Sequence, residues 1–196
     1  MKKIILASAS PRRRELLSLA DIKYSLCIKN VDETVPEGLT PEEGAEYTAE
    51  QKTLPVSEAN PDAIVIGADT IVVQDGEIFG KPKDEEDAKR MLIRLSGKEH
   101  QVITGVCLAA GDVKVKFHET TTVKFHKLER EEINRYVKSG EPMDKAGAYG
   151  IQGRGCLLVE SIDGDFYNVV GLPIARVVRE IKKLSNELPQ EKREQV

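Results

Sequence analysis

The stretch Ile4-Ile5-Leu6-Ala7-Ser8-Ala9-Ser10-Pro11-Arg12-Arg13-Arg14-Glu15-Leu16-Leu17 decides how the chain begins to fold. Its apolar start predicts a strand. Ser10 and Pro11 are typical of the cap and first position of a helix, and the leucines that follow supply an apolar stripe. The spacing therefore predicts a strand, a short turn and a helix. The free amides of such a turn and the dipole of the helix favour a bound anion.

Three arginines occupy the first turn of this predicted helix, where positive charge opposes the helix dipole. An anion bound among them would remove that penalty. The pattern therefore indicates a polyphosphate site formed by Arg12, Arg13 and the turn that contains Ser8 and Ser10. A solvated basic face explains the same residues equally well, so this stretch does not decide between the two.

The composition narrows the class of protein. The chain has 196 residues and a net charge of -4, with no Lys/Arg block and no interleaving of aromatic and basic residues. This length suits one sizeable core or two small lobes, and this charge argues against a protein that coats nucleic acid. The apolar run before Ser8 is too short for a signal peptide or a membrane span. We therefore expect a cytoplasmic protein without a nucleic-acid or membrane partner.

The three cysteines, Cys27, Cys107 and Cys156, lie far apart and show no CxxC spacing. Such cysteines are typical of reduced residues in a cytosolic protein. Because their neighbours are apolar, we expect all three in the core.

Residues 63–73 form the strongest strand signal, a nearly unbroken β-branched run interrupted by Asp69. Such a run predicts a central strand with both faces covered. An unpaired carboxylate is costly to bury, so Asp69 must be protonated, paired, bound to a metal or facing a cleft. The small residues Gly67 and Ala68 beside it leave room for a ligand. We interpret Asp69 as functional.

A capping box at Thr40-Pro41-Glu42-Glu43 predicts a helix that ends before Pro55. Lys52 shares one face of this helix with Ala45 and Ala49, by spacings of three and four residues. Such a lysine either points along a cleft wall or extends its amine to water from the edge of the core. The spacing leaves both alternatives open.

Three turn signals predict hairpins, at Asp75-Gly76, Gly111-Asp112 and Asp163-Gly164. The first hairpin would bring Lys81 close to Asp69. His118 and His126 fall near strand ends in this scheme and lack metal-ligand spacing. The strand arms expected around the second and third turns are residues 101–110, 113–117, 119–125, 157–159 and 167–170. Further helices are expected at residues 84–96 and 131–139 and from Pro173 onward.

Residues 145–155 contain four glycines among polar and aromatic residues. Such a loop lets the backbone come close to a flat ligand, and the amide of Gln152 can both donate to and accept from a base edge. A plain glycine loop between two elements is the alternative.

Four motifs in this order resemble the Maf family of nucleoside triphosphate pyrophosphatases: Ser8-Ala9-Ser10-Pro11-Arg12-Arg13, Gly67-Ala68-Asp69-Thr70, Gly80-Lys81-Pro82 and Asp144-Lys145-Ala146-Gly147-Ala148-Tyr149-Gly150-Ile151-Gln152-Gly153. The likeness covers residues 1–184 as a single domain and leaves residues 185–196 as a charged tail. It implies an α/β fold in which an elongated, mixed, twisted sheet is flanked by helices, with two lobes around a central cleft. A homodimer is also implied by the family.

The resemblance also assigns roles. Asp69 matches the proton acceptor of the family, and Arg12, Thr70 and Gln152 match positions that set substrate preference. The polar cleft positions of the family match Glu33, Lys52 and Lys81. One departure is the Lys52-Thr53-Leu54-Pro55 segment, where the family commonly continues its helix after Lys-Ala.

By this resemblance the late loop is similar to that of the branch acting on dTTP and UTP, whereas the branch preferring 7-methyl-GTP has a different loop. We expect hydrolysis to the monophosphate and pyrophosphate, with Mg²⁺ or Mn²⁺ held by Asp69 and Glu33. This house-cleaning hydrolysis would be linked to cell-division arrest.

The rival hypothesis is a nucleotide-sensing regulator of septum formation that acts by binding partners. A third is an enzyme that hydrolyses ITP or XTP. A carboxylate at Asp69 favours an enzyme, because a triphosphate sensor gains nothing from a negative charge there.

Overall fold

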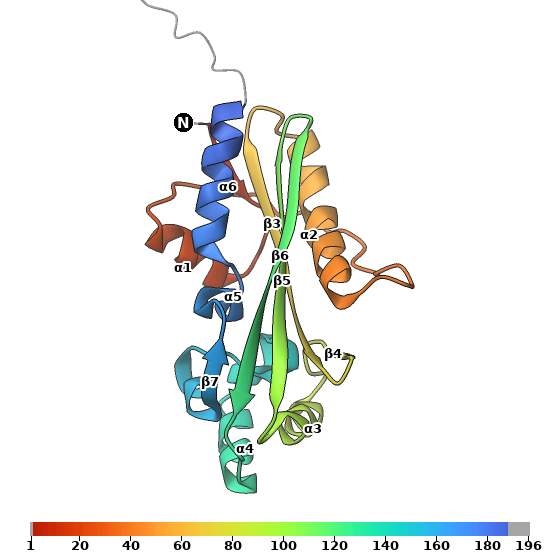
Figure 1. The fold of residues 1–196 in the computed structure, drawn as a ribbon, viewed down its shortest axis with the longest axis vertical. Helices are drawn as coiled ribbons and strands as arrows, with labels where there is room; N and C mark the ends of the chain where they lie inside the picture. The colour runs from red at the N-terminus through yellow and green to blue at the C-terminus, as the bar shows by residue number, and fades with distance from the viewer. Residues whose placement is uncertain (1, 188–196) are drawn as a thin grey trace, which may run out of the picture.

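The computed structural model describes residues 2–187, which form an elongated α/β fold around one twisted sheet (Figure 1). Seven strands make up the sheet within these residues: β1 (Ile4–Leu6), β2 (Ser25–Leu26), β3 (Ile64–Gln74), β4 (Glu77–Phe79), β5 (Glu99–Ala110), β6 (Val113–Phe125) and β7 (Val159–Asp163). The α-helices are α1 (Pro11–Leu19), α2 (Pro41–Glu58), α3 (Glu85–Leu95), α4 (Arg130–Val137), α5 (Phe166–Val170) and α6 (Ile174–Glu187). Short 3₁₀ turns lie at η1 (Glu141–Asp144), η2 (Ala146–Ala148) and η3 (Gly153–Leu158).

The strand order is β2-β1-β3-β5-β6-β7, with β4 paired to β3. The first three strands in this order are parallel and the remaining pairs are antiparallel, so the predicted mixed sheet is confirmed. Pairing of β1 with β3 ends at Ile66, and pairing of β4 with β3 begins at Val72. Residues 67–71 of β3 therefore have β5 on one side and no described strand on the other.

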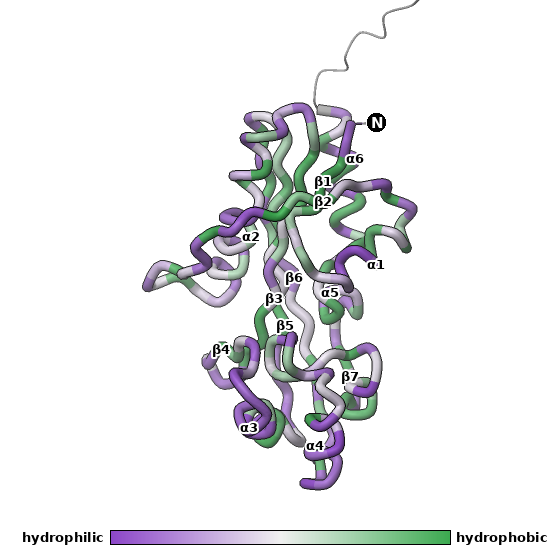
Figure 2. Tube along the Cα trace, turned by 180° about the vertical axis from the view of Figure 1, so that it is seen from behind, coloured by the Kyte–Doolittle hydropathy of each residue, from purple (hydrophilic) through white to green (hydrophobic). Residues whose placement is uncertain are grey.

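Two hydrophobic cores lie at opposite ends of the sheet, which gives the molecule two lobes. In the upper lobe of Figure 1, α1 and α6 pack on one face of the sheet, through residues such as Leu17 and Val177, and α2 covers the other face. In the lower lobe, α3 and α4 pack around Val72 and Phe125. Figure 2 shows the hydrophobic colouring of β1, which is buried, whereas helix α3 carries both hydrophilic and hydrophobic residues, with Leu92 and Leu95 buried.

Helix α2 comes unusually close to the sheet because two glycines face it. A Cβ atom on Gly67 would lie 2.1 Å from Thr53 Oγ1, and one on Gly105 would lie 2.2 Å from the backbone of Ala45. Both distances are far below any real contact. The expectation that Gly67 leaves room for a ligand is therefore wrong, because helix α2 fills that space.

The prediction that this helix ends before Pro55 is also wrong, since α2 continues to Glu58. A proline inside a helix removes one backbone hydrogen bond and costs about 3 kcal/mol. The next turn offsets that cost because Val56 is fully buried and packs with Ile5 and Val65 of the sheet. Tertiary packing thus overrides the local signal.

The third expected hairpin is wrong. Residues 157 and 158 of its first arm belong to the 3₁₀ turn η3, β7 begins only at Val159 and pairs with β6, and residues 166–170 form the helix α5. Asp165 caps this helix by accepting from Tyr167 N, and the buried Asn168 donates to Val102 O. These two polar contacts decide the helix against the strand propensity of Tyr167 and its valine neighbours.

Three smaller expectations also change. Strand β6 runs unbroken from residue 113 to 125, so His118 lies at its middle, where it contacts Glu46 at 2.7 Å, and not near a strand end. Only Cys107 is fully buried; Cys27 is half-buried and Cys156 is exposed, so the expectation of three core cysteines is wrong for Cys156. Helix α6 extends past Ser185 to Glu187, and the rest of the expected tail lies outside the described residues. Within residues 2–187 no helix is long and apolar enough to cross a membrane.

Candidate active site

An open cavity of about 750 Å³ lies along the uncovered edge of β3, between the two lobes. All ten residues singled out in the sequence line it: Ser8, Ser10, Arg12, Arg13, Glu33, Lys52, Asp69, Thr70, Lys81 and Gln152. The structure therefore brings together side chains that are separated by up to 144 positions in the chain.

The charge of this cavity is opposite to that of the protein. Its lining contains six basic side chains and three acidic ones, although the chain as a whole carries a net charge of -4. Cations concentrated in a cleft attract anionic ligands and raise their rate of association. The lining is therefore suited to a polyanion.

Asp69 sits on the strand edge at the cavity and is held by Lys52. The Nζ atom of Lys52 lies 2.8 Å from Asp69 Oδ1 and 2.9 Å from Glu33 Oε2. Helix α2 sets this position, because its close approach at Gly67 places Lys52 directly over β3. Among the alternatives left open for Lys52, the cleft wall is therefore the observed one. The second oxygen of Asp69 accepts no hydrogen bond from a described residue and is available to a ligand or water.

Arg13 is a buried cross-link in the cavity wall. Its guanidinium donates to Gly171 O at 2.8 Å, Ala68 O at 2.7 Å, Ser8 Oγ at 3.0 Å and Thr70 Oγ1 at 3.0 Å. Burial lowers the pKa of Arg13, and the nearby Asp69 carboxylate opposes that shift. Four of its five N–H groups are occupied, so Arg13 shapes the site and retains little capacity to bind a ligand.

Arg12, one residue earlier, points instead across the cavity. Its Nη1 atom lies 3.1 Å from Asp144 Oδ2, and Lys145 Nζ lies 2.6 Å from the other oxygen of the same carboxylate. Burial acts to raise the pKa of Asp144, but the hydrogen bonds from Lys145 and Arg12 outweigh it and hold that pKa below its usual range. This pair links α1 in one lobe to η1 in the other.

The turn before α1 is built as expected except at its cap. Ser10 occupies the cap position and Pro11 the first helical position, but the Ser10 side chain makes no capping hydrogen bond. Instead the Ser10 amide donates to Ser8 Oγ at 3.3 Å. The hydroxyl of Ser10 is therefore not committed to the helix.

The late loop is organised by Glu141, which the sequence did not single out. This carboxylate accepts from the amides of Arg154 and Gly155 and from the hydroxyl of Tyr136. Gln152 lies on the exposed outer part of this loop, where it lines the cavity. The loop thus has a fixed base and an accessible tip.

Three further cavity residues were missed as site residues: Asp144, Lys145 and Tyr149. All three belong to the Asp144–Gly153 motif, so the motif itself was the available signal. The hydroxyl of Tyr149 lies 2.8 Å from Nε2 of the buried His100, and the two atoms share a hydrogen bond. That contact joins the loop to β5.

The carboxylates fit a divalent cation that arrives with its ligand. Residues 2–187 contain no group of three or more His, Cys, Asp or Glu side chains that could hold a metal ion alone. Mg²⁺ usually takes one or two carboxylates and completes its shell with water and substrate phosphates. The free oxygen of Asp69 and the neighbouring, largely exposed Glu33 match that donor set.

Comparison with known proteins agrees with the geometry. Residues 3–184 match the family model described as Maf-like protein. A dTTP/UTP pyrophosphatase of Bacillus velezensis is 54% identical over 184 residues, covering 94% of this chain and 97% of the relative. Proteins with the same name from Bacillus pumilus and Bacillus cereus strain G9842 are 52% and 53% identical, covering 91% and 93% of this chain and 95% and 96% of the relatives.

The solved structure of a HAM1 protein from Coxiella burnetii aligns with a TM-score of 0.51 at 14% identity, over 96% of this chain and all of that one. At that identity the likeness concerns the fold alone. The extent of the family match and the high identity to the Bacillus proteins lead to one conclusion: the chain belongs to the Maf-like protein family.

Proposed function

We propose that this protein is a nucleoside triphosphate pyrophosphatase that hydrolyses dTTP and UTP to the monophosphate and pyrophosphate. The observation that carries the proposal is a carboxylate, Asp69, fixed by Lys52 inside a cavity whose other charges are mainly positive. The cations suit a triphosphate, and the carboxylate suits an attacking water. The names of the Bacillus relatives support the choice of nucleotides.

The reaction needs a water oxygen to attack the α-phosphorus while the bond to the bridging oxygen breaks. Asp69 accepts the proton of that water through its free oxygen, and Lys52 keeps the carboxylate oriented. A positioned general base contributes roughly 100- to 10,000-fold to the rate.

Negative charge builds up on the departing pyrophosphate. Arg12 and Lys81 both line the cavity and would bind its oxygens, and arginine can do so through two parallel hydrogen bonds. Arg13 stabilises this part of the cavity wall through its hydrogen bonds to Gly171, Ala68 and Thr70. A Mg²⁺ or Mn²⁺ ion held by Asp69 and Glu33 would further neutralise the phosphate charge when bound.

The proposal is tested by pyrophosphate release from dTTP, UTP, CTP, ITP, 7-methyl-GTP and ATP, with Mg²⁺ or Mn²⁺ and with the Asp69→Asn variant alongside. Release from dTTP and UTP that is lost in the variant is the expected result. Binding of nucleotide without any release would favour a sensing regulator. Preferential release from ITP would favour the purine-directed enzyme.

A further inference from the structure

A chain of hydrogen bonds lies behind the part of the cavity wall that Thr70 forms. Arg13 Nη2 donates to Thr70 Oγ1 at 3.0 Å, Thr70 Oγ1 lies 2.9 Å from Thr104 Oγ1, and Thr104 Oγ1 lies 3.1 Å from Asn168 O. Thr104 is fully buried on β5 and is not among the cavity-lining residues, whereas Thr70 is partly exposed and lines the cavity.

The chemistry of the two ends fixes the direction of the chain. A guanidinium only donates, so Thr70 accepts from Arg13. A carbonyl only accepts, so Thr104 must use its single hydrogen on Asn168 O. The hydrogen between the two hydroxyls then has to come from Thr70. Only this assignment makes all three contacts hydrogen bonds.

Thr70 consequently has no hydrogen left for a ligand. Its one hydroxyl hydrogen points to Thr104, one lone pair accepts from Arg13, and the remaining lone pair is the only hydrogen-bonding capacity that can face the cavity. Such an oxygen repels the oxygens of a phosphate, which also only accept. It selects a ligand that presents an N–H or O–H.

We propose that Thr104 is a positioning residue for substrate choice: it holds Thr70 as an acceptor, and Thr70 accepts the ring N3–H of uracil or thymine. The inference rests on the proposed function and adds a physical basis for its base preference. Cytosine carries a bare acceptor at the same ring position, so it would place two lone pairs against each other. A site built to pair one polar group rejects an analogue that lacks it far more strongly than an apolar pocket does.

Thr104 can be changed without orphaning its partners. Asn168 O keeps the hydrogen bond from Gly171 N at 2.9 Å, and Thr70 keeps the one from Arg13. Valine has the shape of threonine, so Thr104→Val removes the acceptor for the Thr70 hydrogen and little else. Thr104→Ser preserves the hydroxyl and is the matched control.

The experiment compares kcat/KM for UTP and CTP in the wild type, Thr104→Val and Thr104→Ser, with the melting temperature of each protein measured in parallel. In Thr104→Val the Thr70 hydroxyl can turn its hydrogen toward the cavity and donate to cytosine N3. We expect the ratio of UTP to CTP to fall by about 10-fold, the equivalent of one hydrogen bond. Thr104→Ser should keep the wild-type ratio.

An unchanged ratio in a folded Thr104→Val protein would overturn the inference, and so would an equal change in the serine variant. A wild-type protein that hydrolyses no nucleotide would instead overturn the proposed function. If Thr104→Val does not fold, Thr70→Val provides the second test, because it removes the acceptor oxygen itself. UTP turnover should then fall about 10-fold more than CTP turnover, whereas equal losses would contradict the assignment.

Discussion

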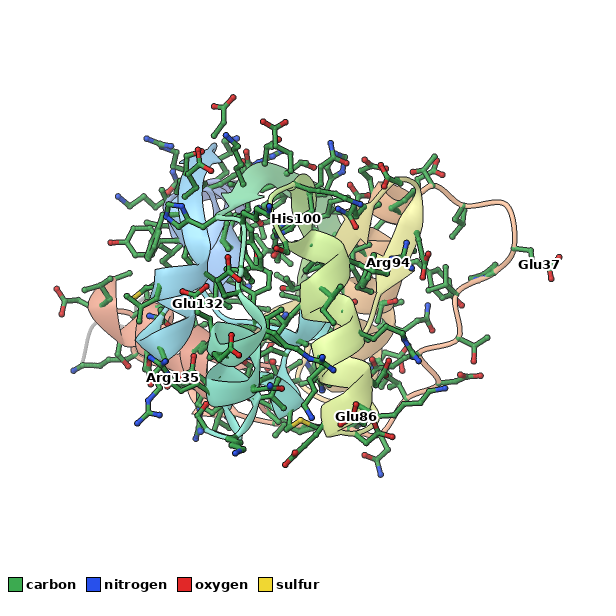
Figure 3. All side chains as sticks on the ribbon, turned by 90° about the horizontal axis from the view of Figure 1, so that it is seen from below. Glu37, Glu86, Arg94, His100, Glu132 and Arg135 are labelled. Atoms are coloured by element: carbon green, nitrogen blue, oxygen red, sulfur yellow. The ribbon has the colours of Figure 1, made fainter. Side chains whose placement is uncertain are left out.

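The cavity has a floor and a rim that are built differently. The floor consists of Arg13, Lys52, Asp69 and Thr70, which lie on or against β3 and are held by hydrogen bonds or ion pairs. The rim consists of the cavity-lining part of the loop after β2, residues 28–33, and of the segment 144–152. Residues 32–40 are all exposed, and Figure 3 shows Glu37 at the tip of their loop, away from the body of the fold. The difference indicates that the side chains of the floor are each fixed by buried or partly buried partners, whereas the rim includes exposed residues such as Gln152.

The largest expected effect comes from the floor. Asp69→Asn keeps the size of the side chain and an oxygen for Lys52, so the fold and nucleotide binding should persist. Turnover should fall by roughly 100- to 10,000-fold because the general base is gone. Single-turnover kinetics at saturating UTP would measure this loss. Retention of near wild-type turnover would show that the floor does not supply the base.

Arg13→Met tests whether the floor is also a structural element. The substitution leaves Ala68 O and Gly171 O without their donor inside the protein. We expect the free energy of unfolding to fall by about 3 kcal/mol, and the melting temperature by roughly 10 °C. Arg12→Met is the matched control, since its ion pair with Asp144 is largely exposed and such pairs contribute about 0–1 kcal/mol. Equal losses in the two variants would contradict the distinction.

His100 lies beneath the rim, where it contacts Tyr149, and it makes the folding stability of the protein depend on pH. Burial lowers the pKa of His100 from 6.5 to about 4 in the folded protein. Between these values the unfolded chain binds the proton and the folded protein does not. The contribution of this pKa difference to the folding stability is therefore fully present above pH 6.5. It is lost as the pH falls toward 4, and the loss is about 2 kcal/mol at pH 5.

Urea denaturation of the wild type and His100→Gln at pH 7 and pH 5 would measure that loss. The difference between the two pH values should shrink by about 2 kcal/mol in the variant. An identical difference in both proteins would assign the pH dependence to other groups.

The smallest expected effect comes from the tip of the rim. Gln152 is exposed and lines the cavity, so Gln152→Ala should leave the fold intact and change selection more than rate. We expect the ratio of pyrimidine to purine turnover to fall by about 10-fold, the equivalent of one lost hydrogen bond. Competition between UTP and ITP in one reaction would show it. A loss of rate without a change in this ratio would mean that Gln152 contributes to the reaction itself and not to base selection.

The floor was more predictable from sequence than its supports. A β-branched run interrupted by one carboxylate is a local signal, and it correctly predicts β3. Of the alternatives that it left open for Asp69, the structure shows pairing with Lys52 and a position at the cleft. Local signals also predict α1 and α3, whose caps and apolar spacings lie within a few residues of one another. The gathering of all ten site residues, however, was implied by the resemblance and not by spacing.

The errors arose where distant contacts outweigh local preference. Pro55 should end a helix, but Val56 gains enough burial against β1 and β3 to carry α2 through it. Residues 167–170 favour a strand, but in the helix Asn168 becomes a buried donor to Val102 O of β5. The pairing of Arg12 with Asp144 spans 132 positions and has no sequence signature.

The three longest strands also bear on how the enzyme moves. Strands β3, β5 and β6 pass without interruption from one core into the other, as Val72 and Ile66 of β3 illustrate. The lobes therefore share three hydrogen-bonded strands, and among residues 2–187 no flexible linker joins them. Opening the cleft would require bending three paired strands together. We therefore expect the floor of the cavity to have the same shape with and without a bound nucleotide. A nucleotide bound here loses little energy to ordering the protein, and motion on binding should be confined to the exposed loops.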